Sequence, residues 1–297
     1  MTERRLKATS QTRASVAVGL RRRRVVLRSR IVAESLSRKL TALYAGGTGL
    51  GLGPPLWSFE LQPLVEFVGV THRYGERVAL GDVYLCIEPG ELVFLVGPSG
   101  AGKTTLLKLI NREVRPTQGK VWVDGLPAHS LPPQRLAELR RRVGVVFQDF
   151  KLLPRLTALE NVAFALQVAD LKVSDEEAAD RALDALEAVG LGDRAASFPG
   201  QLSGGQQQRV AIARAVVSQP ALLIADEPTG NLDLETAWQI ADLLEDVAAF
   251  GTAVLVATHN VEIVRRLQRR ILTLVEGRLV RDQPAGSSGR LAWLAWS

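Results

Sequence analysis

One glycine-rich segment limits the possible folds of this chain more than any other feature. Residues 97–104 read Gly-Pro-Ser-Gly-Ala-Gly-Lys-Thr, which matches the pattern G-x-x-x-x-G-K-[ST]. They follow the apolar run Leu92–Val96 and precede a helix-compatible run over residues 105–111. A strand, a glycine-rich loop and a helix in this order predict a parallel α/β fold with a phosphate site at the loop. The alternative is a glycine-rich turn followed by an unrelated lysine.

The chemistry of this loop suits a nucleotide. Its glycines let backbone N–H groups turn towards phosphate oxygens, and the N-terminus of the following helix adds partial positive charge. We expect the Lys103 ammonium to reach the β- and γ-phosphates and the Thr104 hydroxyl to bind Mg²⁺. The residues expected to contact the nucleotide here are Gly97, Pro98, Ser99, Gly100, Ala101, Gly102, Lys103, Thr104 and Thr105.

Two carboxylates follow a second apolar run. Residues 222–227 read Leu-Leu-Ile-Ala-Asp-Glu, so a strand would deliver Asp226 and Glu227 to the sheet edge where open α/β sheets bind ligands. We expect Asp226 to hold Mg²⁺ through its water shell, and Glu227 to orient and deprotonate an attacking water. The alternative is an acidic pair that only caps the following turn.

A histidine is predicted at the same edge. His259 follows the apolar run 254–258, so it would emerge beside the two carboxylates, where an imidazole N–H could reach a γ-phosphate oxygen. A lone histidine is more often structural, and its position is what favours a functional role.

The apolar pattern indicates one α/β unit with a helical insertion. Helical patterning dominates residues 156–196, and a helix over 175–189 would place Ala178, Ala182, Leu183, Leu186 and Val189 on one face. Two fully apolar runs, at 221–225 and Ala253–Ala257, are typical of strands buried on both faces of a parallel sheet. The other predicted strands cover residues 65–70, 78–87, 92–96, 120–123 and 143–147.

The composition of the chain limits the kinds of partner and metal site that it can have. The chain of 297 residues has a net charge of +6, but residues 1–40 hold twelve basic and two acidic residues, which leaves −4 on the remaining 257. The body of the chain therefore lacks the basic face that nucleic-acid binding needs. The single cysteine, Cys86, excludes disulfides and multi-cysteine metal sites, and we expect it in the core between Leu85 and Ile87. No window has about 18 uninterrupted apolar residues, so no membrane span is expected.

A second glycine-rich segment lies just before another predicted helix, and it indicates which family the chain resembles. Residues 202–206, Leu-Ser-Gly-Gly-Gln, precede a helix-compatible run over 207–217, with Ser203 as its expected N-cap. This segment resembles the signature of ATP-binding cassette (ABC) ATPases, and the resemblance covers residues 65–283. It implies a P-loop NTPase (RecA-like) α/β core with an antiparallel β subdomain and a helical signature subdomain at about 149–203.

The resemblance assigns further site residues. It implies that Tyr74 stacks on adenine, although a buried strand-end tyrosine is the alternative, and that Gln148 lies near Mg²⁺ and water, although it could be an ordinary loop residue. The same matches make Asp226 the magnesium aspartate, Glu227 the catalytic glutamate and His259 the switch histidine. The family also implies a homodimer in which signature residues of one cassette close over the ATP of the other. Those residues are Ser203, Gly204, Gly205 and Gln206.

Three short strings resemble the FtsE family of cell-division ATP-binding proteins. They are residues 147–154, 160–164 and 225–233. The resemblance implies a peripheral ATPase on the cytoplasmic face of the membrane, bound to a polytopic FtsX-like partner that regulates cell-wall hydrolysis. Lipoprotein-release, macrolide-efflux and peptide-resistance cassettes share the third string and remain the alternative. A soluble ABC protein acting on nucleic acid or ribosomes is more distant, because no second cassette or long coiled-coil insertion is present.

Two segments lie outside the family pattern. Residues 1–63 are Arg-rich and then Gly/Pro-rich, which predicts disorder or a start codon assigned too far upstream, with a targeting leader or lipid contact as alternatives. Residues 284–297 form a predicted tail with two tryptophans that either docks on a surface or frays.

Four apolar residues follow Gln148 and are candidates for contact with a partner. They would couple the nucleotide site to a partner helix, or only pack the helical subdomain: Phe150, Leu152, Leu153 and Leu156.

Overall fold

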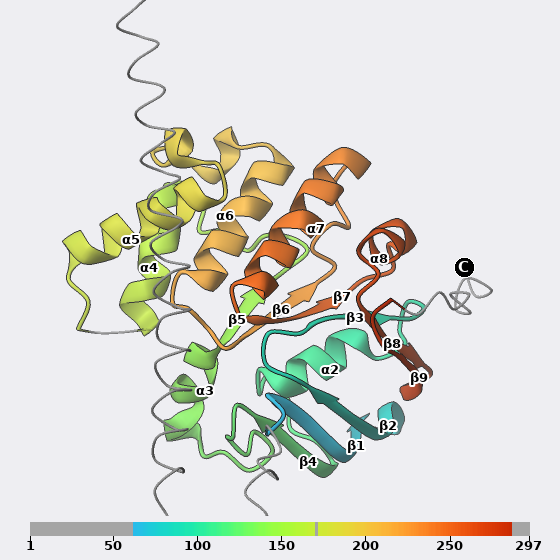
Figure 1. Cartoon of the computed structure of the whole chain (residues 1–297). Coiled ribbons are helices and arrows are strands. Elements are labelled where there is room, and N and C mark those ends of the chain that lie inside the picture. The colour runs from blue at the N-terminus through green and yellow to red at the C-terminus, as the bar shows by residue number, and fades with distance from the viewer. Residues whose placement is uncertain (1–61, 170–171, 287–297) are drawn as a thin grey trace, which may run out of the picture. The chain divides into compact units, whose positions relative to one another are not determined.

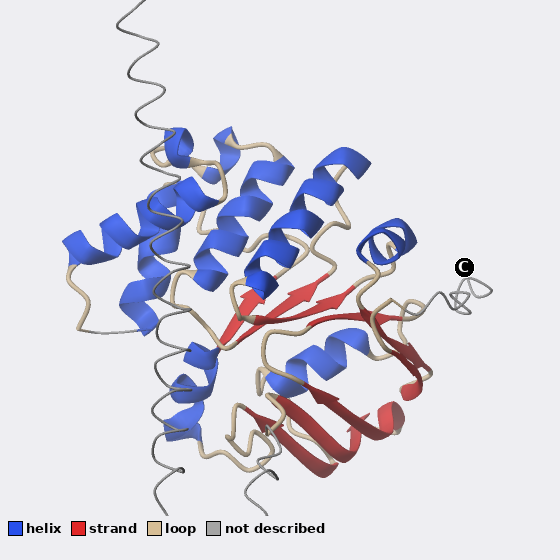
Figure 2. Cartoon of the chain, viewed as in Figure 1, coloured by secondary structure: helices blue, strands red, loops and turns tan. Residues whose placement is uncertain are grey.

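The computed structural model describes residues 62–169 and 172–286. A six-stranded sheet forms its centre, with strand order β5-β6-β7-β3-β8-β9 (Figures 1 and 2). All neighbours in this sheet pair in parallel except β8 and β9, which are antiparallel. The strands are β3 (Leu92–Val96), β5 (Val143–Val146), β6 (Leu222–Asp226), β7 (Ala253–Ala257), β8 (Arg270–Val275) and β9 (Arg278–Gln283).

A smaller antiparallel sheet packs beside the first. Its strand order is β2-β1-β4, with β1 at Val65–Tyr74, β2 at Arg77–Ile87 and β4 at Gln118–Val123. Helix α2 (Lys103–Ile110) lies between the two sheets (Figure 1). Its leucines and Ile110 are buried in one core with side chains of both sheets, so this core fixes the phosphate loop against the small sheet.

Helices on the other face of the large sheet complete the fold. Along β3, alternate side chains enter two different cores, which is why the whole strand is apolar and buried. A third core joins α4, α5 and α6 into the helical part. The helices are α3 (Leu136–Arg142), α4 (Ala158–Ala169), α5 (Asp175–Ala188), α6 (Gly204–Val216), α7 (Leu234–Ala249) and α8 (Val261–Leu267), with short 3₁₀ helices at Pro133–Arg135, Gly192–Arg194 and Pro199–Gln201.

The predicted α/β architecture and its strands are confirmed, with one omission. No element was predicted for residues 270–283, where β8 and β9 form a hairpin. Its two-residue turn, Glu276 and Gly277, has positive φ at both positions (47° and 77°), as type I′ turns require. Glutamate is an uncommon first residue in such a turn, and β9 is mostly exposed and polar. The turn and β9 therefore carry little sequence signal, whereas β8, with its buried, mostly apolar run over residues 271–274, could have been predicted.

Two predictions of burial are wrong. Cys86 is exposed, because β2 alternates strictly here and only Leu85 and Ile87 turn inwards. On α5, Ala178, Ala182 and Leu186 are fully buried as predicted, whereas Leu183 is 37% exposed.

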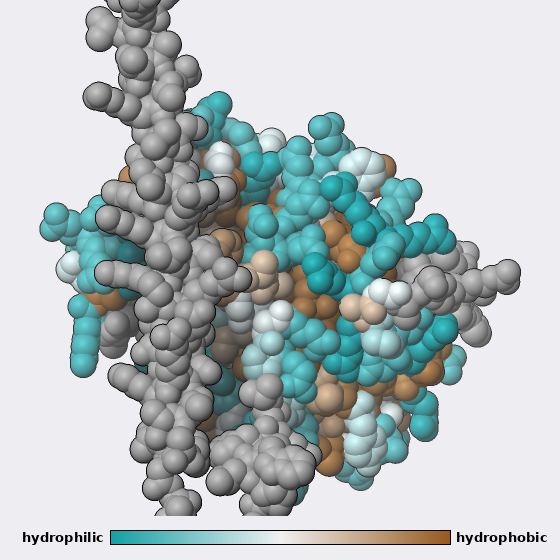
Figure 3. Space-filling view, viewed as in Figure 1, coloured by the Kyte–Doolittle hydropathy of each residue, from teal (hydrophilic) through white to brown (hydrophobic). Residues whose placement is uncertain are grey.

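Within residues 62–169 and 172–286, no helix is both long and apolar enough to cross a membrane. The face drawn in Figure 3 shows hydrophobic areas scattered among hydrophilic ones. The predicted extension 1–63 and tail 284–297 fall almost entirely outside the described residues and stay predictions.

Candidate functional site

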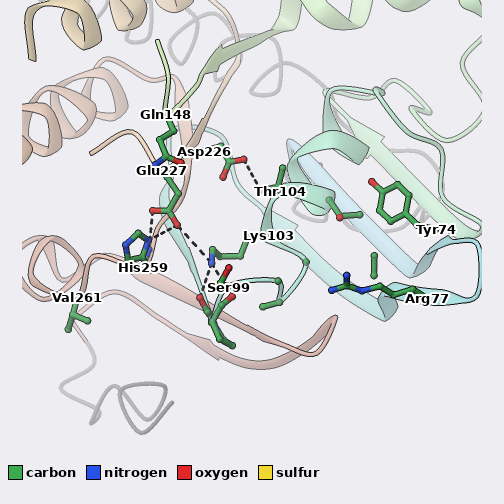
Figure 4. A pocket seen from close by; sticks show the side chains of 17 residues that line it. Tyr74, Arg77, Ser99, Lys103, Thr104, Gln148, Asp226, Glu227, His259 and Val261 are labelled. Carbon is green, nitrogen blue, oxygen red and sulfur yellow. Dashed lines mark hydrogen bonds and ion pairs between the residues drawn. The ribbon is translucent and has the colours of Figure 1, made fainter. Parts of the chain in front are cut away.

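A cavity of about 800 Å³ opens at the carboxyl ends of the parallel strands, and its size is that of a small-molecule site (Figure 4). Residues from both sheets, the glycine-rich loop and three strand ends contribute to it. Its lining includes every residue of 97–105 together with Tyr74, Arg77, Ala79, Gln148, Asp226, Glu227, His259 and Val261.

The glycine-rich loop turns tightly between β3 and α2. At Gly97 a Cβ atom would stand 2.1 Å from the carbonyl oxygen of Leu274, and at Gly102, where φ is 107°, 2.6 Å from that of Ala79. A side chain at either position would thus force the loop away from its neighbours. Lys103 folds back over the loop, and its Nζ donates to the carbonyl oxygens of Gly97 (2.8 Å) and Pro98 (3.3 Å).

Asp226, the last residue of β6, faces the start of α2. The Thr104 hydroxyl donates to Asp226 Oδ2 at 2.8 Å. Burial raises the pKa of Asp226, and the neighbouring Glu227 carboxylate raises it further, while the bond from Thr104 and the Lys103 charge oppose the shift. The carboxylate is therefore held in a site where its negative charge is costly without a cation.

Glu227 points the other way, towards His259 and Lys103 (Figure 4). Its Oε1 lies 2.9 Å from His259 Nδ1 and 3.9 Å from Lys103 Nζ, and its Oε2 accepts from the His259 backbone N–H at 3.2 Å. The side chain of Glu227 is 15% exposed and that of His259 is 67% exposed. Glu227 is therefore a partly shielded carboxylate at the wall of the cavity, with contacts at both of its oxygens.

Gln148 follows β5 and reaches the same cavity. Its Nε2 donates to Asn231 Oδ1 at 3.3 Å, and Asn231 Nδ2 donates back to the Gln148 backbone oxygen at 3.2 Å. Two segments far apart in the sequence are thereby fixed to each other beside Glu227.

Tyr74 and Arg77 form the opposite wall, at the tip of the β1–β2 hairpin. Tyr74 is 46% exposed, so the alternative of a buried strand-end tyrosine is wrong. Its ring and the His72 ring are nearly perpendicular, with their centroids 4.5 Å apart. Arg77 was missed from the sequence, where its only signal is a position three residues after Tyr74.

The predicted signature residues do not line this cavity. Ser203 caps α6 as expected: its Oγ accepts from the Gln206 N–H, and Gln206 Oε1 accepts from the Ser203 N–H. With Gly205 they line a separate hollow of about 280 Å³, and Gly204 opens the same helix. The structure thus brings Tyr74, the glycine-rich loop, Gln148, both carboxylates and His259 together, and places Ser203, Gly204, Gly205 and Gln206 elsewhere.

The oxygen donors fit a magnesium ion better than a softer metal. In the described residues no group of three or more His, Cys, Asp or Glu side chains could hold a metal ion. The paired oxygens of Thr104 and Asp226, 2.8 Å apart, are the hard donors that suit Mg²⁺ when phosphates and waters supply the remaining ligands.

The fold and this site define a class. Residues 80–230 match the family model described as ABC transporter. A solved ATP-binding cassette, MJ0796, dimeric and bound to ADP and Pi, superposes with a TM-score of 0.67 and 40% identity over 74% of this chain and 98% of that one. The chain belongs to the ATP-binding cassettes of the ABC type and is an ATPase.

Its relatives place it further within that class. The cell division ATP-binding protein FtsE of Bacillus subtilis is 46% identical over 227 residues, which are 76% of this chain and 99% of that protein. FtsE of Mycobacterium tuberculosis is 47% identical over 226 residues, with 76% and 97% covered, and FtsE of Escherichia coli is 46% identical over 217 residues, with 73% and 97% covered. The chain therefore belongs to the FtsE family.

Proposed function

We propose that this chain is the ATP-hydrolysing subunit of a cell-division complex, in which it works with a polytopic FtsX-like membrane protein. The observation that carries the hydrolytic part of the proposal is that Glu227 lies 3.9 Å from Lys103 and 2.9 Å from His259 at one end of the cavity. Tyr74 stands at the other end, so the cavity has an aromatic platform for a base and a cluster for the terminal phosphate. The similarity to FtsE proteins supports the role in cell division.

The residues of the cavity have different roles in the proposed hydrolysis of ATP. The loop amides and Lys103 bind the phosphates, and Lys103 must exchange some of its bonds to Gly97 and Pro98 for phosphate oxygens. Glu227 orients a water and accepts its proton as the water oxygen attacks the γ-phosphorus and the bond to the β-phosphate oxygen breaks. His259 holds Glu227 in place and offers its ring to the γ-phosphate.

Thr104, Gln148 and Asp226 would hold Mg²⁺. The ion, when bound, neutralises charge on the β- and γ-phosphates. Asp226 then gains a cation for a carboxylate whose pKa is already raised by burial. Release of the Thr104 hydroxyl from Asp226 would free both oxygens for the ion.

The signature residues act on a second copy. Ser203 and Gly205 border a hollow of their own, well suited to an anion because it lies at the N-terminus of the 13-residue helix α6. In the proposed homodimer, this end of α6 closes over the nucleotide held by the partner's phosphate loop, so each of the two sites needs both chains.

An apolar surface of the helical part, formed by Leu153 and by Phe164 and Val168 of α4, would contact the membrane partner. Leu153 is 39% exposed, and Phe164 and Val168 on α4 are 47% and 62% exposed. Leu152 instead packs in the third core, so only part of the predicted coupling surface is available. A partner helix seated here at the cytoplasmic face would receive movements of the helical part as ATP binds and leaves.

The Glu227→Gln variant tests the enzymatic part. We expect ATP binding to persist, turnover to fall by about 10²–10⁴-fold and a dimer to accumulate with ATP, because only the proton acceptor is lost. Glu262→Gln, an exposed glutamate outside the cavity, is the matched control. Near-normal turnover of Glu227→Gln would contradict the general-base role.

Capture from solubilised membranes tests the partner. The Glu227→Gln chain with ATP should retain an FtsX-like protein, and recovery of a solute permease instead would refute the cell-division role while leaving the ATPase intact.

A further inference from the structure

Arg77 lines the cavity, and the roles proposed above for the other residues do not account for its presence there. It is the first residue of β2 and pairs directly with Tyr74 across the β1–β2 hairpin. Side chains of directly opposed residues in antiparallel strands share one face of the sheet. Both residues line the cavity, and Figure 4 shows the guanidinium directed towards the phosphate loop.

The guanidinium lies over the middle of that loop. Its Nη2 is 3.6 Å from the point that a Cβ atom of Gly100 would occupy. Gly100 has a φ of 76° and no side chain, which keeps the space between the loop and the arginine open. A cation is therefore present on the base side of the loop as well as at Lys103.

In the part of the chain that the structure describes, the charge of Arg77 has no protein partner. Among residues 62–169 and 172–286, no hydrogen bond or ion pair to its side chain is present. Lys103, which lines the same cavity, differs: its ammonium donates to the carbonyl oxygens of Gly97 and Pro98 and lies 3.9 Å from Glu227. An unpaired guanidinium beside a phosphate-binding loop is well matched to phosphate oxygens, because its planar fork can donate two bonds at once.

We propose that Arg77 is a nucleotide-binding residue that contacts the α- and β-phosphates. This inference rests on the proposed use of the cavity for an adenine nucleotide. The γ-phosphate end is marked by Lys103, Glu227 and His259, whereas Arg77 lies beside Tyr74 at the base end. Its contact is made equally with ATP and ADP, so it contributes to binding and not to the chemical step.

The test compares two nucleotides on the full-length chain. Calorimetric titration of Arg77→Gln with ADP and with the non-hydrolysable analogue adenylyl imidodiphosphate should show both affinities weakened by about tenfold, the loss expected for a charged hydrogen bond in an open site. In steady state, the KM for ATP should rise by a similar factor with kcat within about twofold, because uniform binding was removed. Arg77→Lys should recover part of the affinity.

Arg73 provides the control. It lies on the same hairpin, is exposed and does not line the cavity, so Arg73→Gln removes the same charge without the contact. The midpoint of thermal unfolding without nucleotide should be unchanged in both variants. Unchanged ADP affinity in Arg77→Gln, equal losses in both variants, or a loss confined to the ATP analogue would overturn the inference. Failure of the unmodified chain to bind either nucleotide would instead refute the proposed function.

Discussion

Arg214 on α6 ties the helical part of the molecule to the segment after Gln148. Its Nη1 donates to the carbonyl oxygen of Lys151 at 2.6 Å, and its Nη2 donates to that of Phe150 at 2.8 Å. Phe150 and Lys151 both have positive φ, 59° and 48°, a conformation that costs about 1–2 kcal/mol per non-glycine residue. One guanidinium thus holds two strained peptide units in place, and we expect Arg214→Met to release them.

The loss of stability follows from these contacts. Two hydrogen bonds from a charged donor contribute about 1.5–3 kcal/mol each. Part of this is recovered in the variant, because burial lowers the pKa of Arg214 and so the charge is costly to bury, and because water can reach the carbonyl oxygen of the exposed Lys151. A net loss of about 2–3 kcal/mol remains, which lowers the melting temperature by roughly 5–10 °C in a domain of this size.

The same change should slow hydrolysis without weakening nucleotide binding. Gln148 lies two residues before Phe150, so a loosened segment misplaces its side chain, at a cost of about 10–100-fold in kcat. The phosphate loop has no contact with Arg214 in the described structure, and the affinity for ADP should be unchanged.

Differential scanning calorimetry and steady-state kinetics on the full chain measure both effects. Arg214→Lys should lie between the wild type and Arg214→Met, since an ammonium cannot span two carbonyl oxygens as a fork does. Arg140→Met, which removes an exposed arginine from α3, is the control and should change stability by about 0.5 kcal/mol or less. An Arg214→Met protein with normal melting temperature and kcat would refute the argument.

Two further predictions concern the carboxylate and the signature helix. Burial raises the pKa of Asp226, so its ionisation destabilises the nucleotide-free fold once the pH exceeds the unfolded-state pKa; Asp226→Asn should therefore raise the melting temperature at pH 7, with a gain that shrinks towards pH 4, while Mg²⁺-dependent turnover is lost. A Cβ at Gly205 would lie 2.3 Å from Thr236 Cγ2, whereas one at Gly204 would lie 3.3 Å from the flexible end of Leu232 and 3.7 Å, an ordinary contact, from Phe150 Cζ. Gly205→Ala should cost about 1–3 kcal/mol in chemical denaturation and be rescued by Thr236→Ser, and Gly204→Ala should be near neutral.

Features that depend on short runs of sequence were predictable. The phosphate loop, the strand before Asp226 and the Ser203 cap each combine a local pattern with a local physical cause, and each forms as expected. The signature helix was predicted over residues 207–217 and begins three residues earlier, at Gly204, where Ser203 and Gln206 form a capping box.

Features that depend on tertiary contacts were not predictable. Arg77 enters the cavity because β1 and β2 pair with Tyr74 opposite it, and this register is set by the whole hairpin and its irregularities. Cys86 and Leu183 were misplaced for a related reason. An apolar side chain inside a strand or helix is buried only if its face meets another layer, and composition does not show which face does.

The sequence does not show that the side chains of the two adjacent carboxylates, Asp226 and Glu227, point in different directions. Neighbouring residues at a strand end carry the same charge, yet Asp226 binds Thr104 at 2.8 Å while Glu227 meets His259 at 2.9 Å. The backbone separates them: Glu227 leaves the strand with a φ of 50°, and its N–H is held by the Ala257 carbonyl oxygen at 2.8 Å. This strained conformation is unfavourable for glutamate alone, and the pairing of β6 with β7 supplies the bond that maintains it. The sheet therefore gives two adjacent carboxylates different partners. The proposed division of roles, a metal ligand at Asp226 and a proton acceptor at Glu227, depends on this separation.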